Sequence, residues 1–410
     1  MNKTISPEQA MKLLLKQTAE LSVKETESIP LVHASGRSVR NQIRAVMNQP
    51  PFSRSALDGY ALRSADTAGA SPKTPVRLPV VQTLYAGAPA QYPLPPKQAV
   101  RIMTGAPLPE GADCILPQEL TDCGKEQVEI YRELSVGSNV CRQGEDVPLG
   151  MVLLEPGTLL TPVHIGMLAG QGFREIEVFR QLKIGLLSTG YELLRPGQIW
   201  QPGKIFDCNA AQIQARLCQF GFLTVQDQSP NTISGTAQMI HTMLQNCDAL
   251  VTTGGISVGE EDFLPQSLAQ IGADILFRGI RQKPGGGMLA ACYNRKLILC
   301  LSGNPFAAAA TLEQYALPAL LRLGGRQETL CIPKRARLHL KSHFDKTSSQ
   351  HRFLRGIAQG AEVILPGKTE DHASGSLRTM IGCNCLVCLP AGTGPLVPDT
   401  EVEVMYFVQP

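Results

Sequence analysis

The chain has 410 residues, which is too long for one ordinary hydrophobic core and predicts roughly two to four domains. Hydrophobic residues make up 43% and charged residues 18% of the sequence, and this composition excludes extensive disorder. The 38 Lys and Arg nearly balance the 35 Asp and Glu, so the net charge of +3 does not indicate a nucleic-acid partner.

The first predicted element is a helix over residues 6–21. Ser6 is expected to cap it, Pro7 to occupy the first helical position and Gln9 to complete a capping box. This N-terminal segment has polar residues where a signal peptide carries its apolar core, and no later stretch reaches the length of a membrane span. We therefore expect a cytoplasmic protein without a membrane partner.

Four segments with different residue patterns follow the first helix. Short apolar runs punctuated by Pro and Gly predict a β-rich module that ends near Asp146, and the glycine-rich segment 147–180 is interpreted as a return into an earlier domain. Strand and helix patterns alternate over 181–325, which favours an α/β domain with a mainly parallel sheet. From residue 330 onward, short alternating runs indicate a compact β-barrel or sandwich.

Twelve cysteines are spread along the chain, and we expect them to be reduced and mostly buried. The densest group is Cys383, Cys385 and Cys388, in a segment that reads as a strand. Spacings of two and three along a strand do not bring three thiols to one tetrahedral site, which disfavours a metal centre there.

Three loops that follow predicted strands are candidates for a ligand site, because ligands of open parallel sheets gather beyond the carboxyl ends of the strands. They are Ser188–Glu192, Gly254–Asp262 and Ser302–Pro305. Their glycine and hydroxyl residues would let backbone N–H groups approach an anion, although such loops are also ordinary α/β turns. Their carboxylates could bind a hard divalent cation or could simply be solvated.

Nucleotide-binding motifs of two common kinds do not occur. The sequence contains no G-x-x-x-x-G-K-[ST], and no G-x-G-x-x-G follows a predicted strand to open a helix. These absences disfavour a P-loop nucleotidase and a Rossmann dehydrogenase.

The ordered motifs resemble those of the molybdopterin molybdotransferases, a family that includes the E domain of gephyrin-like proteins. The resemblance covers nearly the whole chain. The motifs are PFSRSALDGYA at 51–61, RIMTGAPLPEGAD at 101–113, CRQGED at 141–146, STG at 188–190, GGISVGEEDF at 254–263, KPG at 283–285 and SGNP at 302–305.

This resemblance implies an architecture of four domains and a homodimer whose active cleft lies between two subunits. The implied parts are an elongated helical N-terminal domain (1–45 and 147–180), an inserted β-rich module (46–146), an α/β domain like the molybdopterin adenylyltransferases (181–327) and a C-terminal β-barrel (328–410). The implied activity is insertion of molybdate into adenylylated molybdopterin with release of AMP, in molybdenum cofactor biosynthesis. Mg2+ or another divalent cation would assist. A molybdopterin adenylyltransferase and recipient molybdoenzymes are the further partners implied.

Site residues are carried over by position. The acidic positions that matter in the family correspond to Asp58, Asp146, Glu192, Asp227 and Asp262, of which Glu192 and Asp262 are the expected metal or pyrophosphate ligands. Lys283 is expected to face the oxyanion, since an ammonium is a compact charge suited to molybdate or phosphate. The expected substrate-binding residues are Ser188, Thr189, Gly190, Gly254, Gly255, Ser257, Gly303, Asn304, Pro305, Arg352 and Ser374.

Three residues depart from the family's usual pattern. Tyr191 stands where the family has Asp, Gly286 where it has a second Lys, and Ser302 where it has Pro. The changes remove a carboxylate, a positive charge and a rigid turn from the expected site. From the sequence alone, Gly286→Lys, alone or with Ser302→Pro, is expected to tighten molybdate binding.

These departures keep a second hypothesis open, in which the protein is a weakly active or inactive paralogue that acts as a molybdopterin-binding or cofactor-delivery scaffold. Retention of Asp58, Glu192 and Asp262 argues against a fully inactive site. A third hypothesis, pterin adenylylation, fits the α/β segment but leaves the long flanking segments unexplained.

Overall fold

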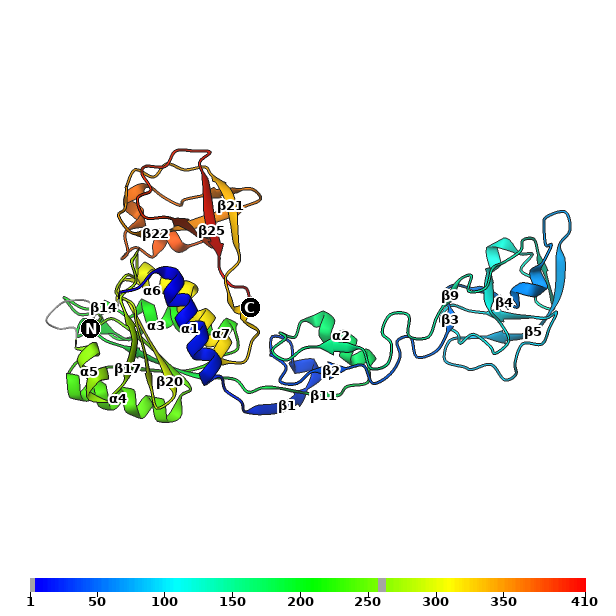
Figure 1. Ribbon diagram of the computed structural model, residues 1–410, viewed down its shortest axis with the longest axis horizontal. Coiled ribbons are helices and arrows are strands. Elements are labelled where there is room, and N and C mark those ends of the chain that lie inside the picture. The colour runs from blue at the N-terminus through cyan, green and yellow to red at the C-terminus, as the bar shows by residue number, and fades with distance from the viewer. Residues whose placement is uncertain (1–3, 257–262) are drawn as a thin grey trace. The chain divides into compact units, whose positions relative to one another are not determined.

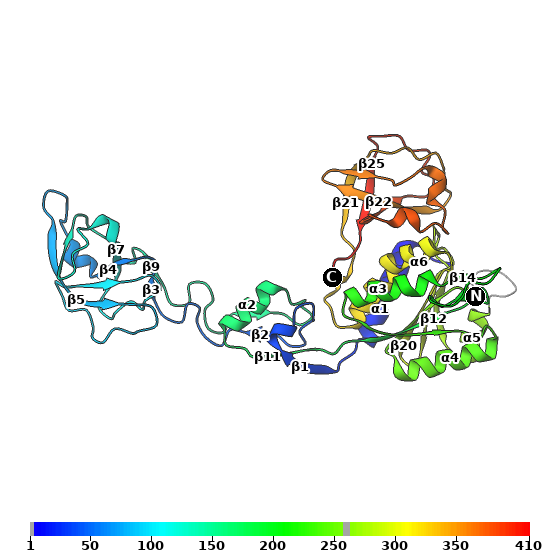
Figure 2. The same cartoon turned by 180° about the vertical axis from the view of Figure 1, so that it is seen from behind.

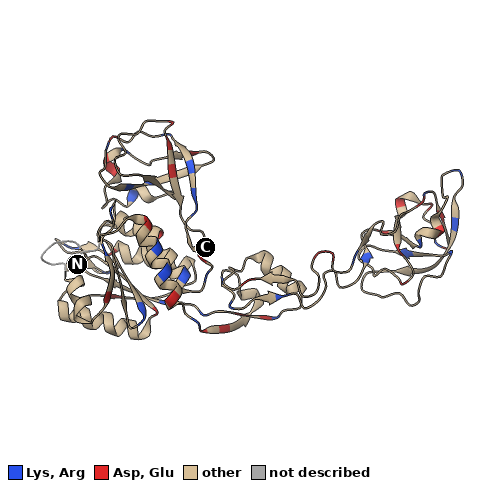
Figure 3. Cartoon of the chain, in the orientation of Figure 1, with Lys and Arg blue, Asp and Glu red and all other residues tan. Residues whose placement is uncertain are grey.

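The computed structural model describes residues 4–256 and 263–410, which form two compact units (Figure 1). The first unit contains the N-terminal segment to Asn41, Pro156–Ile165 and Glu175–Pro410; the second contains Gln42–Glu155 and Gly166–Arg174. Residues of both charge signs are interspersed in each unit (Figure 3). No helix within the described ranges has the length and apolar character required to cross a membrane.

The first unit is built on a six-stranded sheet. Its strand order is β15 (Leu223–Gln228), β12 (Lys183–Ser188), β16 (Ala249–Thr253), β20 (Lys296–Leu301), β19 (Leu289–Tyr293) and β17 (Asp274–Arg278). The first four strands pair in parallel, whereas β19 and β17 continue the sheet in antiparallel pairing. The expected mainly parallel α/β sheet is confirmed.

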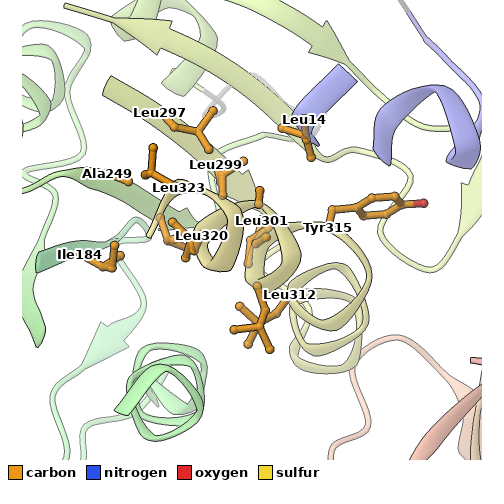
Figure 4. Close-up of a cluster of buried hydrophobic side chains, with 14 of the residues drawn as sticks. Leu14, Ile184, Ala249, Leu297, Leu299, Leu301, Leu312, Tyr315, Leu320 and Leu323 are labelled. Carbon is orange, nitrogen blue, oxygen red and sulfur yellow. The ribbon is translucent and has the colours of Figure 1, made fainter. Parts of the chain in front are cut away.

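Both faces of this sheet are buried, because its central strands are buried at successive positions, which point alternately to the two faces. Leu297, Leu299 and Leu301 of β20 face one core (Figure 4), while Ile298 and Cys300 face the other. The first core is covered by α1 (Pro7–Leu21), α3 (Cys208–Gln219), α6 (Pro305–Thr311) and α7 (Leu317–Leu323). The second is covered by α4 (Ile233–Asn246) and α5 (Leu264–Gln270), on the opposite face from α3 and α6 (Figure 2).

Helix α1 begins as its sequence predicts. The Ser6 hydroxyl accepts a hydrogen bond from the Gln9 amide, the Gln9 side chain accepts one from the Ser6 amide, and Pro7 occupies the first turn. Its Ala10 and Leu14 are fully buried in the core beneath the sheet, so the N-terminal helix is part of the α/β core.

A π-helical segment, Leu312–Ala316, connects α6 to α7 and is completely buried. Within it, Glu313 forms an ion pair with Arg216 of α3, with Nε and Oε1 2.6 Å apart. The neighbouring Tyr315 donates its hydroxyl to the Gln282 side chain, and Gln282 donates to Gln314 over 3.0 Å. Single-turn π segments are rare and are frequently found at functional sites.

The C-terminal strands form a closed barrel. The strand order is β18 (Gln282–Lys283), β22 (His351–Gln359), β23 (Glu362–Ile364), β21 (Arg335–Leu340), β25 (Glu401–Tyr406) and β24 (Cys385–Leu389), and pairing of β22 with β24 closes it. The alternating runs left a barrel or a sandwich open, and the C-terminal β-barrel that the family resemblance implies is confirmed. Cys385 and Cys388 belong to cores on opposite sides of β24.

The second unit is centred on a five-stranded sheet, which confirms a β-rich module. Its order is β7 (Cys114–Pro117), β4 (Gly59–Leu62), β6 (Ala99–Ile102), β5 (Val76–Leu84) and β8 (Gln127–Ile130). Two short antiparallel pairs accompany it, β3 (Arg54–Ser55) with β9 (Val140–Cys141) and β2 (Ile43–Arg44) with β10 (Val152–Leu154).

The remaining strands and α-helices are short. They are the antiparallel pair β1 (Thr26–Pro30) and β11 (Glu175–Phe179), the parallel pair β13 (Leu193–Leu194) and β14 (Ile205–Phe206), and the helices α2 (Pro162–Gly170) and α8 (Glu328–Cys331).

Asp248 joins the beginnings of two neighbouring strands. Its carboxylate accepts hydrogen bonds from the Lys183 amide, over 2.8 Å, and from both terminal nitrogens of Arg180. Burial of Asp248 opposes ionisation, but these hydrogen bonds and the charge of Arg180 outweigh it and lower the pKa of the carboxyl below its ordinary value.

Because this pKa is lower in the folded than in the unfolded chain, the pair stabilises the fold above the unfolded value of about 4 and loses this effect as the pH falls through the folded value. We expect the melting temperature to fall less between pH 6 and pH 3 (about the range over which carboxyls titrate) in Asp248→Asn than in the wild type. Asp274→Asn, at an exposed position, is the control. Parallel curves for the wild type and Asp248→Asn would contradict this.

Candidate functional site

A pocket of about 970 Å³ lies at the carboxyl ends of β12, β16 and β20, and residues of the first unit line it. Its wall includes the ends of all three glycine-containing loops, the segment 283–287 and residues of the barrel. The predicted site residues that it brings together are Thr189, Gly190, Glu192, Gly254, Gly255, Lys283, Gly303, Asn304, Pro305, Arg352 and Ser374.

The glycines of these loops allow the three strand ends to approach one another closely. Gly254 has a φ of +82°, and a Cβ there would lie 2.5 Å from the Thr189 carbonyl oxygen. The Gly254 amide donates to the Leu301 carbonyl over 3.1 Å, so the second loop is also bound to the third. A side chain at Gly254 would therefore force the loops apart.

Two cationic residues stand side by side in the pocket wall. Strand β18 pairs in parallel with β22, and this register places Lys283 opposite Arg352. Lys283 is exposed, and the described residues give its ammonium neither an ion pair nor a hydrogen bond. Arg352 is half-buried; its guanidinium packs over the Phe344 ring, and burial lowers its pKa. One terminal nitrogen of Arg352 donates to the Thr347 carbonyl over 3.2 Å, and the other donors of this cation pair are suited to bind an anion.

Ser374 is positioned from the α/β side of the pocket. Its carbonyl oxygen accepts a hydrogen bond from the Phe306 amide over 2.9 Å, which links the barrel loop to the start of α6. On the same side, the Asn209 side chain donates to the Gly303 carbonyl over 2.8 Å. The first contact fixes the barrel loop to α6, and the second fixes the third loop to α3.

Glu192 is the acidic residue of the first loop. The Glu192 side chain is exposed in the pocket, and its carboxylate lies over Gly190. The part of the chain that the structure describes supplies no hydrogen bond or ion pair to this carboxylate. An uncommitted carboxylate is a suitable oxygen ligand for a hard cation such as Mg2+. The other expected ligand, Asp262, lies outside the described residues, as does Ser257.

Several pocket residues were not predicted from the sequence. Asp207 caps α3 by accepting from the Ala210 amide over 3.0 Å, and it also accepts a hydrogen bond from the Ser188 hydroxyl. An Asp directly before a helix is a recognisable capping signal, so this residue could have been found. Asn231 accepts from the Gly190 amide over 2.8 Å, and no sequence signal marks it.

His372 is a further unpredicted residue of the pocket wall. Burial, and next the charge of Arg355, lower its pKa to about 4, so its imidazole is neutral at pH 7. Both ring nitrogens are buried and have no hydrogen-bond partner within the described part of the chain. A neutral ring avoids placing a third positive charge beside Arg352 and Arg355.

Four other predicted residues do not line this pocket. Ser188 is buried behind it, and Asp227 forms an ion pair with Arg195 over 2.9 Å. Asp58 and Asp146 belong to the second unit, where Asp58 accepts two hydrogen bonds from Thr104 that lower its pKa. The catalytic roles expected for Asp58, Asp146 and Asp227 and the substrate-binding role expected for Ser188 remain predictions.

Models of three regions of one family match the chain in order. The region described as MoeA N-terminal region (domain I and II) matches residues 5–172, the probable molybdopterin binding domain matches 185–322, and the MoeA C-terminal region (domain IV) matches 337–407.

Full-length relatives agree with these matches. The molybdopterin molybdenumtransferase of Bacillus subtilis is 34% identical over 93% of this chain and 90% of its own length, and that of Staphylococcus epidermidis is 31% identical over 98% and 95%. The chain belongs to the molybdopterin molybdenumtransferase family. A crystal structure of the molybdopterin biosynthesis MoeA protein from Pyrococcus horikoshii has a TM-score of 0.84 at 25% identity, covering 99% of this chain and all of that one.

The departures from the usual pattern of the molybdopterin molybdenumtransferases lie together. Tyr191, Gly286 and Ser302 all line the pocket. The Ser302 hydroxyl accepts a hydrogen bond from the Asn304 amide over 3.2 Å, so this turn is closed by a side chain in place of a proline ring.

Gly286 sits in a turn that has no room for a side chain. A Cβ there would lie 2.6 Å from the Gln282 carbonyl oxygen, while the Gly286 carbonyl accepts a bond from the Ile280 amide over 2.7 Å. This crowding reverses the expectation for Gly286→Lys. The variant is expected to have a lower melting temperature and to bind molybdate less tightly than the wild type.

The matched control is Gly287→Lys. The nearest atoms to a Cβ at Gly287 are 3.8 Å away, and the residue also lines the pocket, so this variant adds the same charge without the collision. An unchanged melting temperature in Gly286→Lys, measured by scanning calorimetry beside Gly287→Lys, would show that the turn accommodates a side chain.

Proposed function

We propose that this pocket inserts molybdate into adenylylated molybdopterin and releases AMP, in molybdenum cofactor biosynthesis. Membership of the molybdopterin molybdenumtransferase family supports this function. The structural observation that carries it is the pairing of Lys283 with Arg352 across β18 and β22, in a pocket whose other wall is made of glycine loops. A molybdate dianion needs two compensating charges, and these residues supply two.

Each group has a distinct part in the proposed reaction. Lys283 and Arg352 bind the oxyanion, and the backbone of the glycine loops receives the phosphates of the adenylylated pterin. Glu192 would hold Mg2+ together with Asp262, and the cation, when bound, would offset pyrophosphate charge. The buried Ser188–Asp207 pair would fix the end of β12 to the start of α3 behind the pocket.

The test is to incubate the purified full-length protein with adenylylated molybdopterin, molybdate and Mg2+ and to measure AMP by chromatography. AMP release that depends on both the protein and molybdate is expected. A rate equal to that of the mixture without protein would overturn the proposal.

The alternative, a binding or delivery scaffold, is supported by one observation: all three departures line the pocket. A scaffold would bind adenylylated molybdopterin in calorimetry and release no AMP in the same assay. This result would replace the enzymatic proposal.

We also propose the cytoplasmic homodimer with four domains per chain that the family resemblance implies, with an adenylyltransferase and recipient molybdoenzymes as partners. An interface between copies would complete the cleft with acidic residues such as Asp58. Sedimentation at micromolar concentration is expected to give a dimer, and a single monomeric species would contradict this.

A further inference from the structure

The segment 191–206 exposes an unusual set of large apolar side chains at the edge of the pocket. The side chains exposed by 42% or more include those of Tyr191, Ile199, Trp200, Ile205 and Phe206. Of these, Tyr191, Ile205 and Phe206 line the pocket itself. Exposed apolar surface gathered at one place marks a binding site more often than single exposed residues do.

The Tyr191 ring is held in position by its neighbours. Its hydroxyl donates to the Asn231 carbonyl over 2.7 Å, so the side chain spans from the loop after β12 to the loop before α4. Its carbonyl accepts from the Lys204 ammonium, and the Lys204 carbonyl accepts from the Trp200 indole over 3.0 Å. A ring fixed before binding loses little conformational freedom when a ligand packs on it.

The rest of the pocket lacks an equivalent surface. Among the described lining residues, Tyr191 and Phe206 carry the exposed aromatic side chains, since Phe353 is buried and Phe263 is half-buried. The glycine loops, Lys283 and Arg352 offer N–H groups and charge, which bind phosphate and oxyanion but not a planar ring. The substrate of the proposed reaction contains two planar heterocycles, adenine and pterin.

We propose that Tyr191 is a stacking platform for a planar heterocycle of the substrate, adenine or pterin, an inference that rests on the proposed function. The replacement of a carboxylate by Tyr at this position then exchanges a charge near the phosphates for a contact with the ring beside them. Stacking on an aromatic side chain depends on the π face of the ligand and is largely independent of its polar edge.

The experiment measures calorimetric binding of AMP, ribose 5-phosphate and 6-hydroxymethylpterin to the full-length protein. Tyr191→Ala is expected to weaken AMP or the pterin on the order of 10-fold and to leave ribose 5-phosphate unchanged. Tyr191→Phe keeps the ring and is expected to stay within about 3-fold of the wild type, because it loses only the hydrogen bond to the Asn231 carbonyl. Ile199→Ala, at an exposed site outside the pocket lining, is the matched control and should change nothing.

The outcomes separate the possible sources and the possible failures. If Tyr191→Ala weakens the binding of AMP alone, adenine is the ring that stacks on Tyr191. If it weakens the binding of 6-hydroxymethylpterin alone, the pterin is that ring. Unchanged affinities in Tyr191→Ala, or an equal loss for ribose 5-phosphate, overturn the stacking proposal and leave the proposed function standing. A wild-type protein that binds none of the three ligands overturns both.

The only tryptophan of the sequence, Trp200, provides a second readout. Because it is linked to Tyr191 through Lys204, its emission on excitation of the indole is expected to change when the ligand that stacks on Tyr191, AMP or 6-hydroxymethylpterin, binds. The change should disappear in Tyr191→Ala and persist in Tyr191→Phe. Emission that responds equally to AMP and ribose 5-phosphate in the wild type would count against contact with the base.

Discussion

Replacing Lys283 with alanine is expected to lower molybdate-dependent AMP release on the order of 100-fold, the effect of removing one donor that stabilises an oxyanion. Lys283 is exposed in the pocket and stands opposite Arg352 in the β18–β22 register. Without the Lys283 ammonium, the half-buried guanidinium of Arg352 would be the remaining cation of the pair. The maximal rate should fall, and the concentration of molybdate that gives half of the maximal rate should rise.

Two comparisons isolate the role of Lys283. Lys283→Arg keeps the charge and is expected to lose less activity, although a guanidinium does not reproduce the compact ammonium. Lys24→Ala removes the same net charge at an exposed site outside the pocket lining and should leave the rate unchanged. Activity of Lys283→Ala equal to that of Lys24→Ala would place the oxyanion elsewhere.

Replacing Glu313 with alanine is expected to reduce the free energy of unfolding of the α/β part by about 3 kcal/mol, because it leaves the Arg216 charge without its carboxylate. The Glu313 side chain is 7% exposed, and burial raises the pKa of its carboxyl in spite of the neighbouring Arg216. Arg216 would retain the Val408 carbonyl, which accepts over 2.6 Å, and the face of Phe220.

The matched variant is Glu313→Leu combined with Arg216→Met. Removing both charges and filling the space with apolar groups is often neutral, so most of the stability lost in Glu313→Ala should return. Urea unfolding followed by circular dichroism measures both. If Glu313→Ala unfolds at the same midpoint urea concentration as the wild type, the Glu313–Arg216 ion pair does not contribute to the free energy of unfolding.

Local patterns predicted much of the fold because they depend on neighbouring residues. The capping box of Ser6 and Gln9, the continuous apolar run of β20 and the glycine loops are all properties of short segments. The alternation of the C-terminal strands could not choose between a barrel and a sandwich, since the choice depends on the pairing of β22 with β24, which closes the sheet; the barrel was predicted from the family resemblance.

The candidate site was predictable only in part for the same reason. Lys283 and Arg352 lie far apart in the sequence. They become neighbours through the short parallel pairing of β18 with β22, which no local sequence pattern predicts. Asp207 combines a local capping role with a contact to Ser188 that only the folded chain reveals. The crowding around Gly286 depends on carbonyl groups of its own turn, which composition does not show.

The buried π segment Leu312–Ala316 also marks a place where the length of the chain can change by one residue. A π turn holds one more residue than an α turn, so deletion of one residue here would restore regular α-helical hydrogen bonds. Because the extra residue is held within a single turn, the helix after it would keep its orientation. Leu320 and Leu323 of α7 would still face the sheet. Relatives with one residue fewer in this helix are therefore expected to keep the apolar face of α7, and an alignment gap placed here requires no compensating change on that face.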